Sequence, residues 1–245
     1  MSIKFSNNFL LRKLHQITGI VPLGLFFAVH MLTNAKAMGG EKVFNDAVLD
    51  IHHLPFLFFI EVGGIFLPLI FHSVYGIIIS AQSRNNVSNY GYGRNWLYVF
   101  QRVTGVFLFA FLLFHLMHFR WGFFGTFGLT QVAVAGNADK AFAIVATDFS
   151  LWWVSILYIV GIAATAWHLA YGIFLFTLDF GLVIGEKAQS YVLKGCAAVG
   201  IGLFTLGANT VLAFKWKNCG LVPAMLCEQP KEGKTAELPS GAKKF

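Results

Sequence analysis

A histidine-centred pattern that occurs twice, each time inside a long apolar run, constrains this chain more than any other feature of its sequence. Residues 71–76 (FHSVYG) recur later in the chain as residues 167–172 (WHLAYG). Ionisable side chains are costly in hydrocarbon, so a histidine in such a setting is by default a functional residue. The recurrence indicates an internal repeat.

A second pair of similar segments precedes the two copies. Residues 14–19 (LHQITG) lead through Phe-rich sequence to His30, and residues 100–105 (FQRVTG) lead likewise to His115. The chain therefore consists of two matching halves with two histidines each. The repeat also indicates which histidines belong together.

The composition is that of an integral membrane protein. Hydrophobic residues make up 57% of the 245 residues, charged residues only 12%, and the mean hydropathy is +0.67. A water-soluble domain of this length would have too little polar surface at such a composition. The net charge of +7 lies in short basic clusters between apolar runs, which is typical of a topology signal. We therefore expect a lipid bilayer, and no nucleic acid, as a partner.

Five apolar segments are long enough for the roughly 20 residues that a transmembrane helix needs. The sequence thus predicts an all-α membrane protein with five transmembrane helices, four of which carry the histidines. The expected helices are residues 17–33, 54–81, 96–119, 151–178 and 191–214. They form one transmembrane domain over residues 1–215, and a polar tail follows over residues 216–245. The connection over residues 120–150 contains apolar patches that suit packing on the helix bundle.

Basic residues that flank the helices indicate the orientation in the membrane. One side holds Arg12, Lys13, Arg84, Arg94, Arg102, Lys187 and Lys194. The two opposite loops are charge-balanced, and only the lysine-rich tail departs from the pattern. Because positive residues are enriched on the cytoplasmic side, we expect a cytoplasmic N-terminus.

The direction of the helices pairs the four histidines. Each histidine lies in the C-terminal half of its helix, so alternating helices place His30 and His115 toward the outer face, and His72 and His168 toward the cytoplasmic face. Two ligands must lie at one depth to clamp one porphyrin, and the repeat gives the same pairs. We therefore predict a haem-binding four-helix bundle with two bis-histidine haems, which would carry single electrons. No CxxCH motif is present, so both would be non-covalent haem b.

Two glycines of the repeated pattern are further candidates for haem contacts. Gly76 and Gly172 lie one turn after His72 and His168, on the same helix faces. The absence of a side chain would let a macrocycle approach the backbone. Glycines in membrane helices also serve close helix packing, and the repetition favours the haem contact.

Other polar residues are candidates for contacts with a quinone or a haem. Glu61 lies well inside an apolar segment, where a carboxylate suits proton exchange with a quinone near the outer haem. The alternative is a structural hydrogen bond. Arg12, His15 and Arg102 lie at the cytoplasmic ends of the first and third helices and suit contacts with haem propionates or a quinone. The alternative for the arginines is a role in topology alone.

The remaining histidines and two cysteines are expected to have other roles. We interpret three histidines as outer-surface residues without a ligand role: His52, His53 and His118. Cys219 and Cys227 lie in the tail and are candidates for a disulfide.

Several of these segments resemble a known family. They are the run from Arg12 to His30, the segment over residues 54–76 with Glu61 and HSVYG, and the stretch from residues 94–96 (RNW) through QRVTG to His115. They closely resemble the di-haem cytochrome b membrane anchor subunit of succinate dehydrogenase and fumarate reductase, the succinate:quinone oxidoreductases. The likeness is greatest to the single-anchor, five-helix type, and it covers about residues 9–215.

The resemblance implies a multi-pass subunit of the bacterial cytoplasmic membrane that docks a flavoprotein and an iron–sulfur protein on the cytoplasmic side. The dicarboxylate chemistry would lie in those partners, and this chain would be the non-flavin membrane subunit of the enzyme. Electrons would pass between the partners and a quinone, menaquinone or ubiquinone, through two haems. The family's axial ligands fall on His30, His72, His115 and His168. The whole complex is a candidate for oligomerisation.

Two other classes of protein are compatible with the residues. One is the cytochrome b anchor of another quinone-linked oxidoreductase, such as a hydrogenase or formate dehydrogenase. The other is a haem-free, proton-coupled membrane transporter with a His/Glu network, which would be colourless. Some fumarate reductases of the resembling family carry a glutamate for proton transfer two residues before the fourth ligand, where this chain has Ala166.

Overall fold

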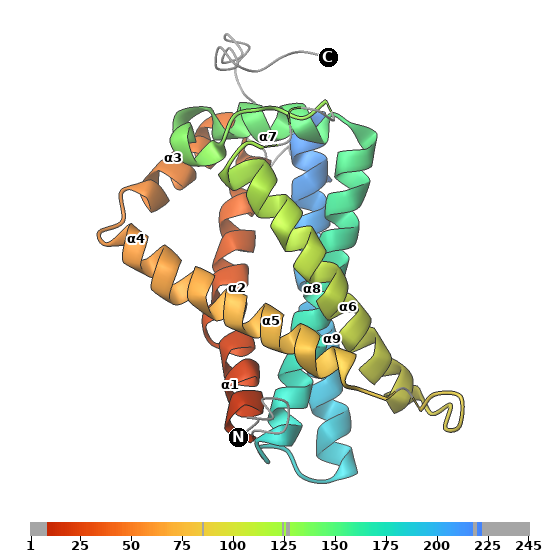
Figure 1. Cartoon of the computed structure of the whole chain (residues 1–245). Coiled ribbons are helices and arrows are strands. Elements are labelled where there is room, and N and C mark those ends of the chain that lie inside the picture. Colours follow the sequence, from red (N-terminus) through yellow and green to blue (C-terminus); the bar gives the residue numbers. More distant parts are fainter. Residues whose placement is uncertain (1–8, 85, 124, 126–127, 218–219, 222–245) are drawn as a thin grey trace. The chain divides into compact units, whose positions relative to one another are not determined.

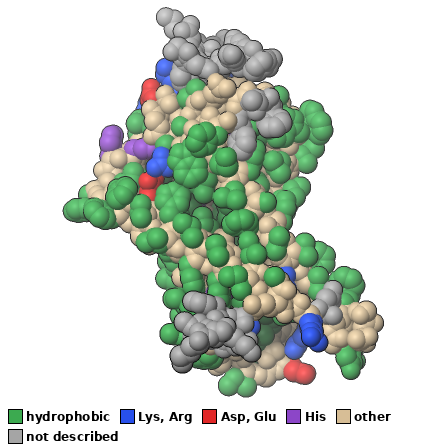
Figure 2. All heavy atoms as spheres, in the orientation of Figure 1, with side chains coloured by type: hydrophobic (Ala, Val, Ile, Leu, Met, Phe, Trp, Pro, Cys, Tyr) green, Lys and Arg blue, Asp and Glu red, His purple; other side chains and the backbone are tan. Residues whose placement is uncertain are grey.

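The computed structural model describes residues 9–84, 86–123, 125, 128–217 and 220–221. Within these residues every regular element is a helix, which confirms the predicted all-α fold (Figure 1). Five helical segments are long and apolar enough to cross a membrane: Phe9–Gly39, Leu57–Ala81, Gly93–Arg120, Trp152–Asp179 and Glu186–Trp216. Hydrophobic side chains dominate the face seen in Figure 2, as lipid-facing helices require.

The first span consists of three helices, namely α1 (Phe9–Ile20), α2 (Pro22–Ala35) and the 3₁₀-helix η2 (Lys36–Gly39). A proline begins α2, where its missing N–H leaves no helical hydrogen bond unmade. The span starts well before the predicted residue 17. Lys13 and Gln16 on α1 donate hydrogen bonds to Asp179 at the end of α8 (Trp152–Asp179). These contacts stabilise the first turns of α1, which are too polar to be predicted as part of an apolar span.

Two of the spans contain π-helical turns. The second span runs through α4 (Leu57–Phe59), the π-helix η3 (Ile60–Phe66) and α5 (Leu67–Ala81). The third span is α6 (Gly93–His115), which continues as the π-helix η4 (Leu116–Arg120). The fifth is α9 (Glu186–Trp216). π-helical turns are frequent at functional sites, and η3 contains Glu61 while η4 contains His118.

Close contacts divide the chain into two compact units. The first comprises the described residues of Met1–Ala28, Phe58–Ala110 and Ala163–Gly202, and the second those of Val29–Leu57, Phe111–Ile162 and Leu203–Phe245. The first unit contains His72 and His168, whereas the second contains His30 and His115. Each histidine pair predicted from the sequence therefore lies within one unit.

The second unit includes the two connections that follow the first and third spans. They form α3 (Glu41–His52), the short 3₁₀-helices η5 (Val134–Gly136) and η6 (Ala138–Lys140), and α7 (Ala141–Phe149). α7 lies beside α3, and seven of its nine residues are buried (Figure 1). Phe44 of α3 and Phe142 of α7 both pack edge-on or tilted against Phe214 of α9. The apolar patches between residues 120 and 150 therefore pack on the helices of this unit, as expected.

We call α3, η5, η6 and α7 together the cap of the second unit. Replacing Asn45 with alanine should destabilise this cap. The buried Asn45 side chain accepts a hydrogen bond from the Phe142 N–H (2.8 Å) and donates one to the Asp139 carbonyl (2.7 Å). Removing one partner of a buried hydrogen bond costs about 1–3 kcal/mol. We expect a lower Tm of the purified complex, followed by circular dichroism.

A matched control lies on the same helix. The exposed ion pair between Lys42 and Asp46 spans one turn of α3, and such pairs contribute only about 0.3–0.5 kcal/mol. Lys42→Ala should therefore leave the Tm nearly unchanged. An equal Tm for Asn45→Ala and the wild type would show that the two buried bonds do not hold the cap.

Candidate functional site

In the first unit, two imidazole rings face each other from different helices. His72 lies on α5 and His168 on α8, with ring centroids 6.4 Å apart and planes nearly perpendicular, at 87°. The structure therefore brings together one of the two pairs predicted from the sequence.

A short segment of α1 orients the His72 ring. The Nδ1 of His72 lies 2.8 Å from the carbonyl oxygen of His15, to which it donates as the Nδ1–H tautomer. The His15 ring stacks on the His72 ring, with centroids 4.0 Å apart. At Gly19, one turn further along α1, a Cβ would collide with the His72 ring. Because Nδ1 carries the proton, Nε2 keeps its lone pair for a metal.

α6 orients the His168 ring in a similar way. The Thr104 hydroxyl lies 3.2 Å from Nδ1 of His168 and 2.7 Å from the Phe100 carbonyl oxygen. Because the hydroxyl donates to this carbonyl, it accepts the Nδ1–H of His168, and Nε2 again keeps its lone pair. A Cβ at Gly105 would lie only 3.0 Å from Cε1 of His168.

The two glycines that lie against the histidine rings occupy matching positions of the internal repeat. Gly19 ends the segment LHQITG, Gly105 ends the segment FQRVTG, and each glycine lies against one histidine of the pair. The acceptor of the Nδ1–H differs, since it is a backbone carbonyl for His72 and a hydroxyl for His168. The repeated segments therefore build the two sides of one site.

In the second unit, the other predicted pair also meets. His30 on α2 and His115 at the end of α6 have ring centroids 5.9 Å apart and an interplanar angle of 82°. Asn34 donates a hydrogen bond to the His30 carbonyl (2.7 Å), and Phe111 stacks beside the His115 ring. The Nδ1 of His115 lies 3.3 Å from the hydroxyl of Tyr158 on α8.

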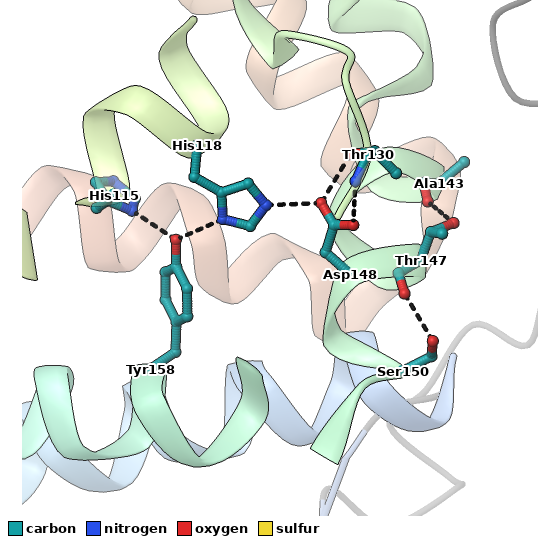
Figure 3. Close-up of polar contacts among 8 residues, drawn as sticks. All are labelled: His115, His118, Thr130, Ala143, Thr147, Asp148, Ser150 and Tyr158. Atoms are coloured by element: carbon teal, nitrogen blue, oxygen red, sulfur yellow. Dashed lines mark hydrogen bonds and ion pairs between the residues drawn. The ribbon is translucent and has the colours of Figure 1, made fainter. Parts of the chain in front are cut away.

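The Tyr158 hydroxyl leads on to a buried hydrogen bond between a histidine and a carboxylate. It lies 3.2 Å from Nδ1 of His118, whose Nε2 lies 2.8 Å from Oδ2 of Asp148 on α7 (Figure 3). Asp148 also accepts hydrogen bonds from the backbone N–H and the hydroxyl of Thr130, at 2.8 Å and 2.7 Å. A buried carboxylate needs this set of partners, because an uncompensated charge in the interior is strongly destabilising.

The predicted surface position of His118 is wrong. Its side chain is only 1% exposed, whereas His52 and His53 are exposed as expected. His118 is buried because α7 packs over it and supplies Asp148 as a hydrogen-bond partner from a distant part of the sequence. An acid inside the apolar run of residues 141–149 is the sequence signal that points to such a partner.

Comparisons with known proteins identify the family of this chain. A family model described as the succinate dehydrogenase/fumarate reductase transmembrane subunit matches residues 84–208. The succinate dehydrogenase cytochrome b558 subunit of Bacillus subtilis (strain 168) is 32% identical over 209 residues, which cover 85% of this chain and 98% of that protein. This chain belongs to the succinate dehydrogenase/fumarate reductase transmembrane subunit family. The resemblance predicted from the sequence is confirmed, and no solved structure matches the chain.

The donor geometry of this family member fits axial ligation of haem. An imidazole nitrogen bonds a transition metal at about 2 Å, so two imidazoles on opposite sides of one iron have ring centroids about 6 Å apart. Both pairs match that separation. In the described part of the chain, no group of three or more His, Cys, Asp or Glu residues is placed to hold a metal ion alone. A porphyrin supplies four nitrogens itself and needs only two protein ligands.

A buried polar atom beside the His72–His168 pair fits the polar edge of a cofactor. Nδ1 of His15, whose ring stacks on that of His72, is buried and has no hydrogen-bond partner in the described structure. Such groups are rare in folded proteins. The guanidinium of Arg102 lies over the Tyr98 ring, 3.7 Å from its centroid. The contacts of Arg12, His15 and Arg102 with haem propionates or a quinone stay a prediction.

The other predicted residues have more varied positions. Glu61 is partly exposed and belongs to the same unit as His72, so its nearness to the outer haem stays a prediction. A Cβ at Gly76 would lie 3.0 Å from Cε1 of His15, and a Cβ at Gly172 would lie 3.4 Å from Nε2 of Gln101. Both glycines therefore face residues of the repeated segments, and their contact with haem stays a prediction. The predicted disulfide between positions 219 and 227 lies outside the described residues.

Alanine at Gly19 or Gly105 should displace the adjacent histidine ring. If each histidine pair holds one haem b, Gly19→Ala and Gly105→Ala should each lose roughly half of the haem b of the purified complex, since one of the two pairs would be disturbed. Alanine is favoured over glycine in a helix by about 1 kcal/mol, so a weaker helix would not explain the loss. The pyridine haemochrome assay measures the haem content.

Gly202 on α9 provides the control, because a Cβ there would meet no atom within 4 Å. Gly202→Ala should retain the full haem content. Full retention in Gly19→Ala and Gly105→Ala as well would mean that close approach of the glycine backbone does not position the ligands.

Proposed function

We propose that this chain carries electrons between the partner subunits of a succinate:quinone oxidoreductase and a membrane quinone, through two b-type haems. His72 and His168 would hold one haem, and His30 and His115 the other. The observation that supports this proposal best is the facing of two histidine pairs, each drawn from two different spans, at separations that fit one iron per pair. The cytochrome b name of the Bacillus subtilis relative agrees with it.

The histidine pairs determine what kind of chemistry the sites support. When bound, a bis-histidine haem supplies a one-electron centre without an open coordination position. The protein holds each ring in one tautomer: the His15 carbonyl does so for His72, and the Thr104 hydroxyl for His168. Such outer hydrogen bonds orient metal ligands and raise their basicity. The sites therefore favour electron transfer over oxygen activation.

The partners follow from membership of the family. We infer a flavoprotein subunit, in which succinate or fumarate reacts, and an iron–sulfur subunit, both on the cytoplasmic side of a bacterial cytoplasmic membrane. The basic residues around Arg12, Arg84 and Arg94 support a cytoplasmic N-terminus by the positive-inside rule.

The quinone would exchange protons as well as electrons. Glu61 is our candidate for that exchange, because it lies on a π-helical turn within an otherwise apolar span. Arg12, His15 and Arg102 are our candidates for contacts with the propionates of the haem at His72 and His168. The family relationship favours this function over a hydrogenase-type anchor or a haem-free transporter.

Single histidine substitutions test the two sites. His72→Ala and His115→Ala should each reduce the haem b content from about two to about one per chain, because each removes one axial ligand of a different haem. Reduced-minus-oxidised spectra should lose a different component in each variant. His52→Ala, at an exposed histidine, should keep both. A complete wild-type complex without haem would overturn the proposal.

Glu61→Gln tests the quinone step separately. We expect both haems to remain and succinate oxidation with an artificial soluble acceptor to be unchanged, while quinone reduction falls at least about tenfold because a proton-exchanging group is lost. Glu186→Gln, at an exposed glutamate at the start of α9, should leave both activities unchanged. Normal quinone reduction in Glu61→Gln would leave the glutamate a structural role only.

A further inference from the structure

We propose that a hydrogen-bond relay from Asp148 through His118 and Tyr158 positions the His115 ring and lowers the reduction potential of the haem that this ring would bind. The inference rests on the proposed function, because it assigns His115 as an axial ligand. His118, Asp148 and Tyr158 would be positioning residues, since they act on the iron only through His115.

The relay is continuous and lies inside the second unit. The steps are 3.3 Å from His115 Nδ1 to the Tyr158 hydroxyl, 3.2 Å from that hydroxyl to His118 Nδ1, and 2.8 Å from His118 Nε2 to Asp148 Oδ2 (Figure 3). The Tyr158 side chain is 5% exposed, and those of His118 and Asp148 are fully buried. Water therefore does not screen the interactions, and they are stronger than at a surface.

The protons of the relay all point toward the carboxylate. If His115 binds iron through Nε2, its Nδ1 carries a proton and donates to Tyr158. The tyrosine hydroxyl then donates to Nδ1 of a neutral His118, and the Nε2–H of His118 donates to Asp148. Every donor of the relay has an acceptor in this arrangement, and each hydrogen bond polarises the next.

Thr130 fixes the end of the relay. Its backbone N–H and its hydroxyl both donate to the Asp148 carboxylate. The carboxylate thus has three protein donors, two on Thr130 and one on His118. α7 supplies it, so the cap of the second unit contributes directly to the site.

The expected consequence is a more basic His115 imidazole. A hydrogen-bond acceptor behind a metal-bound histidine raises the basicity of the ligand and orients its ring. For His115 that acceptor is the Tyr158 hydroxyl, which Asp148 polarises through His118. A more basic ligand stabilises ferric over ferrous iron, and hydrogen bonding around a cofactor is one of the means by which proteins set its potential.

The Tyr158 hydroxyl leads through His118 to Asp148. In the first unit, by contrast, Nδ1 of His72 donates to a backbone carbonyl, and Nδ1 of His168 donates to a hydroxyl that itself donates to the Phe100 carbonyl. The relay would therefore act on one haem only.

Two variants interrupt the relay at different points. Tyr158→Phe removes the hydroxyl but keeps the ring that packs edge-on against Phe149, with centroids 4.8 Å apart. Asp148→Asn removes the charge but keeps an oxygen for the Thr130 N–H. The readouts on the purified complex are a redox titration of the haem spectra and the low-spin ferric signals in electron paramagnetic resonance, which report the orientation of axial imidazoles.

We expect both haems in each variant, a more positive midpoint potential for one haem component, and a changed resonance signal for that component alone. The midpoint potential of the double variant should shift little further than that of Tyr158→Phe, because the effects of substitutions within one hydrogen-bond network are not additive. Two controls should match the wild type: Tyr171→Phe, an equally buried tyrosine on α8, and Thr147→Val, whose hydroxyl bonds only within α7 according to the described contacts.

The possible failures are distinguishable. Two bound haems with unchanged potentials and signals in both Tyr158→Phe and Asp148→Asn would overturn the relay and leave the proposed function intact, even if the Tm fell. If Asp148→Asn does not assemble, Tyr158→Phe decides alone. A wild-type complex without haem would overturn the proposed function and the relay with it.

Discussion

An imidazole buried in an apolar helix bundle must have one ring nitrogen satisfied by the protein before the other can serve as a ligand. Of the four histidines in the two facing pairs, His72, His168 and His115 meet this constraint through Nδ1, with a backbone carbonyl, a threonine hydroxyl and a tyrosine hydroxyl as the respective partners. The arrangement around them follows from it. α1 and α6 approach the rings through glycines, and α7 encloses the polar groups behind His115.

Much of this arrangement is readable from the sequence. Apolar length alone predicts the five spans, because a helix that crosses hydrocarbon has few alternatives. The internal repeat and the alternating helix direction predict that His72 meets His168 and that His30 meets His115, and the structure brings these pairs together. The same repeat also contains Gly19 and Gly105. That they lie against His72 and His168 becomes clear only when the helices are packed.

What the sequence does not predict depends on contacts between distant segments. His118 lies near the end of an apolar run, where exposure is the ordinary expectation, and only the return of α7 over it reverses that expectation. Neither a fixed sequence period nor a motif links Asp148 to His118, which it contacts, or Thr130 to Asp148. The start of α1 is missed for a similar reason, since Lys13 is stabilised by Asp179 at the far end of another span.

The division of the two pairs between separate units also bears on biogenesis. Chains are made from the N-terminus, and the segments fold in that order. The His30–His115 pair is complete once α6 has been made, whereas the His72–His168 pair must wait for α8. The residues behind His115 arrive later still than His115 itself, because Asp148 and Tyr158 follow it in the chain. A partly synthesised chain thus has both histidines of one pair before the groups that contact His115, and the two pairs are completed at different stages of membrane insertion.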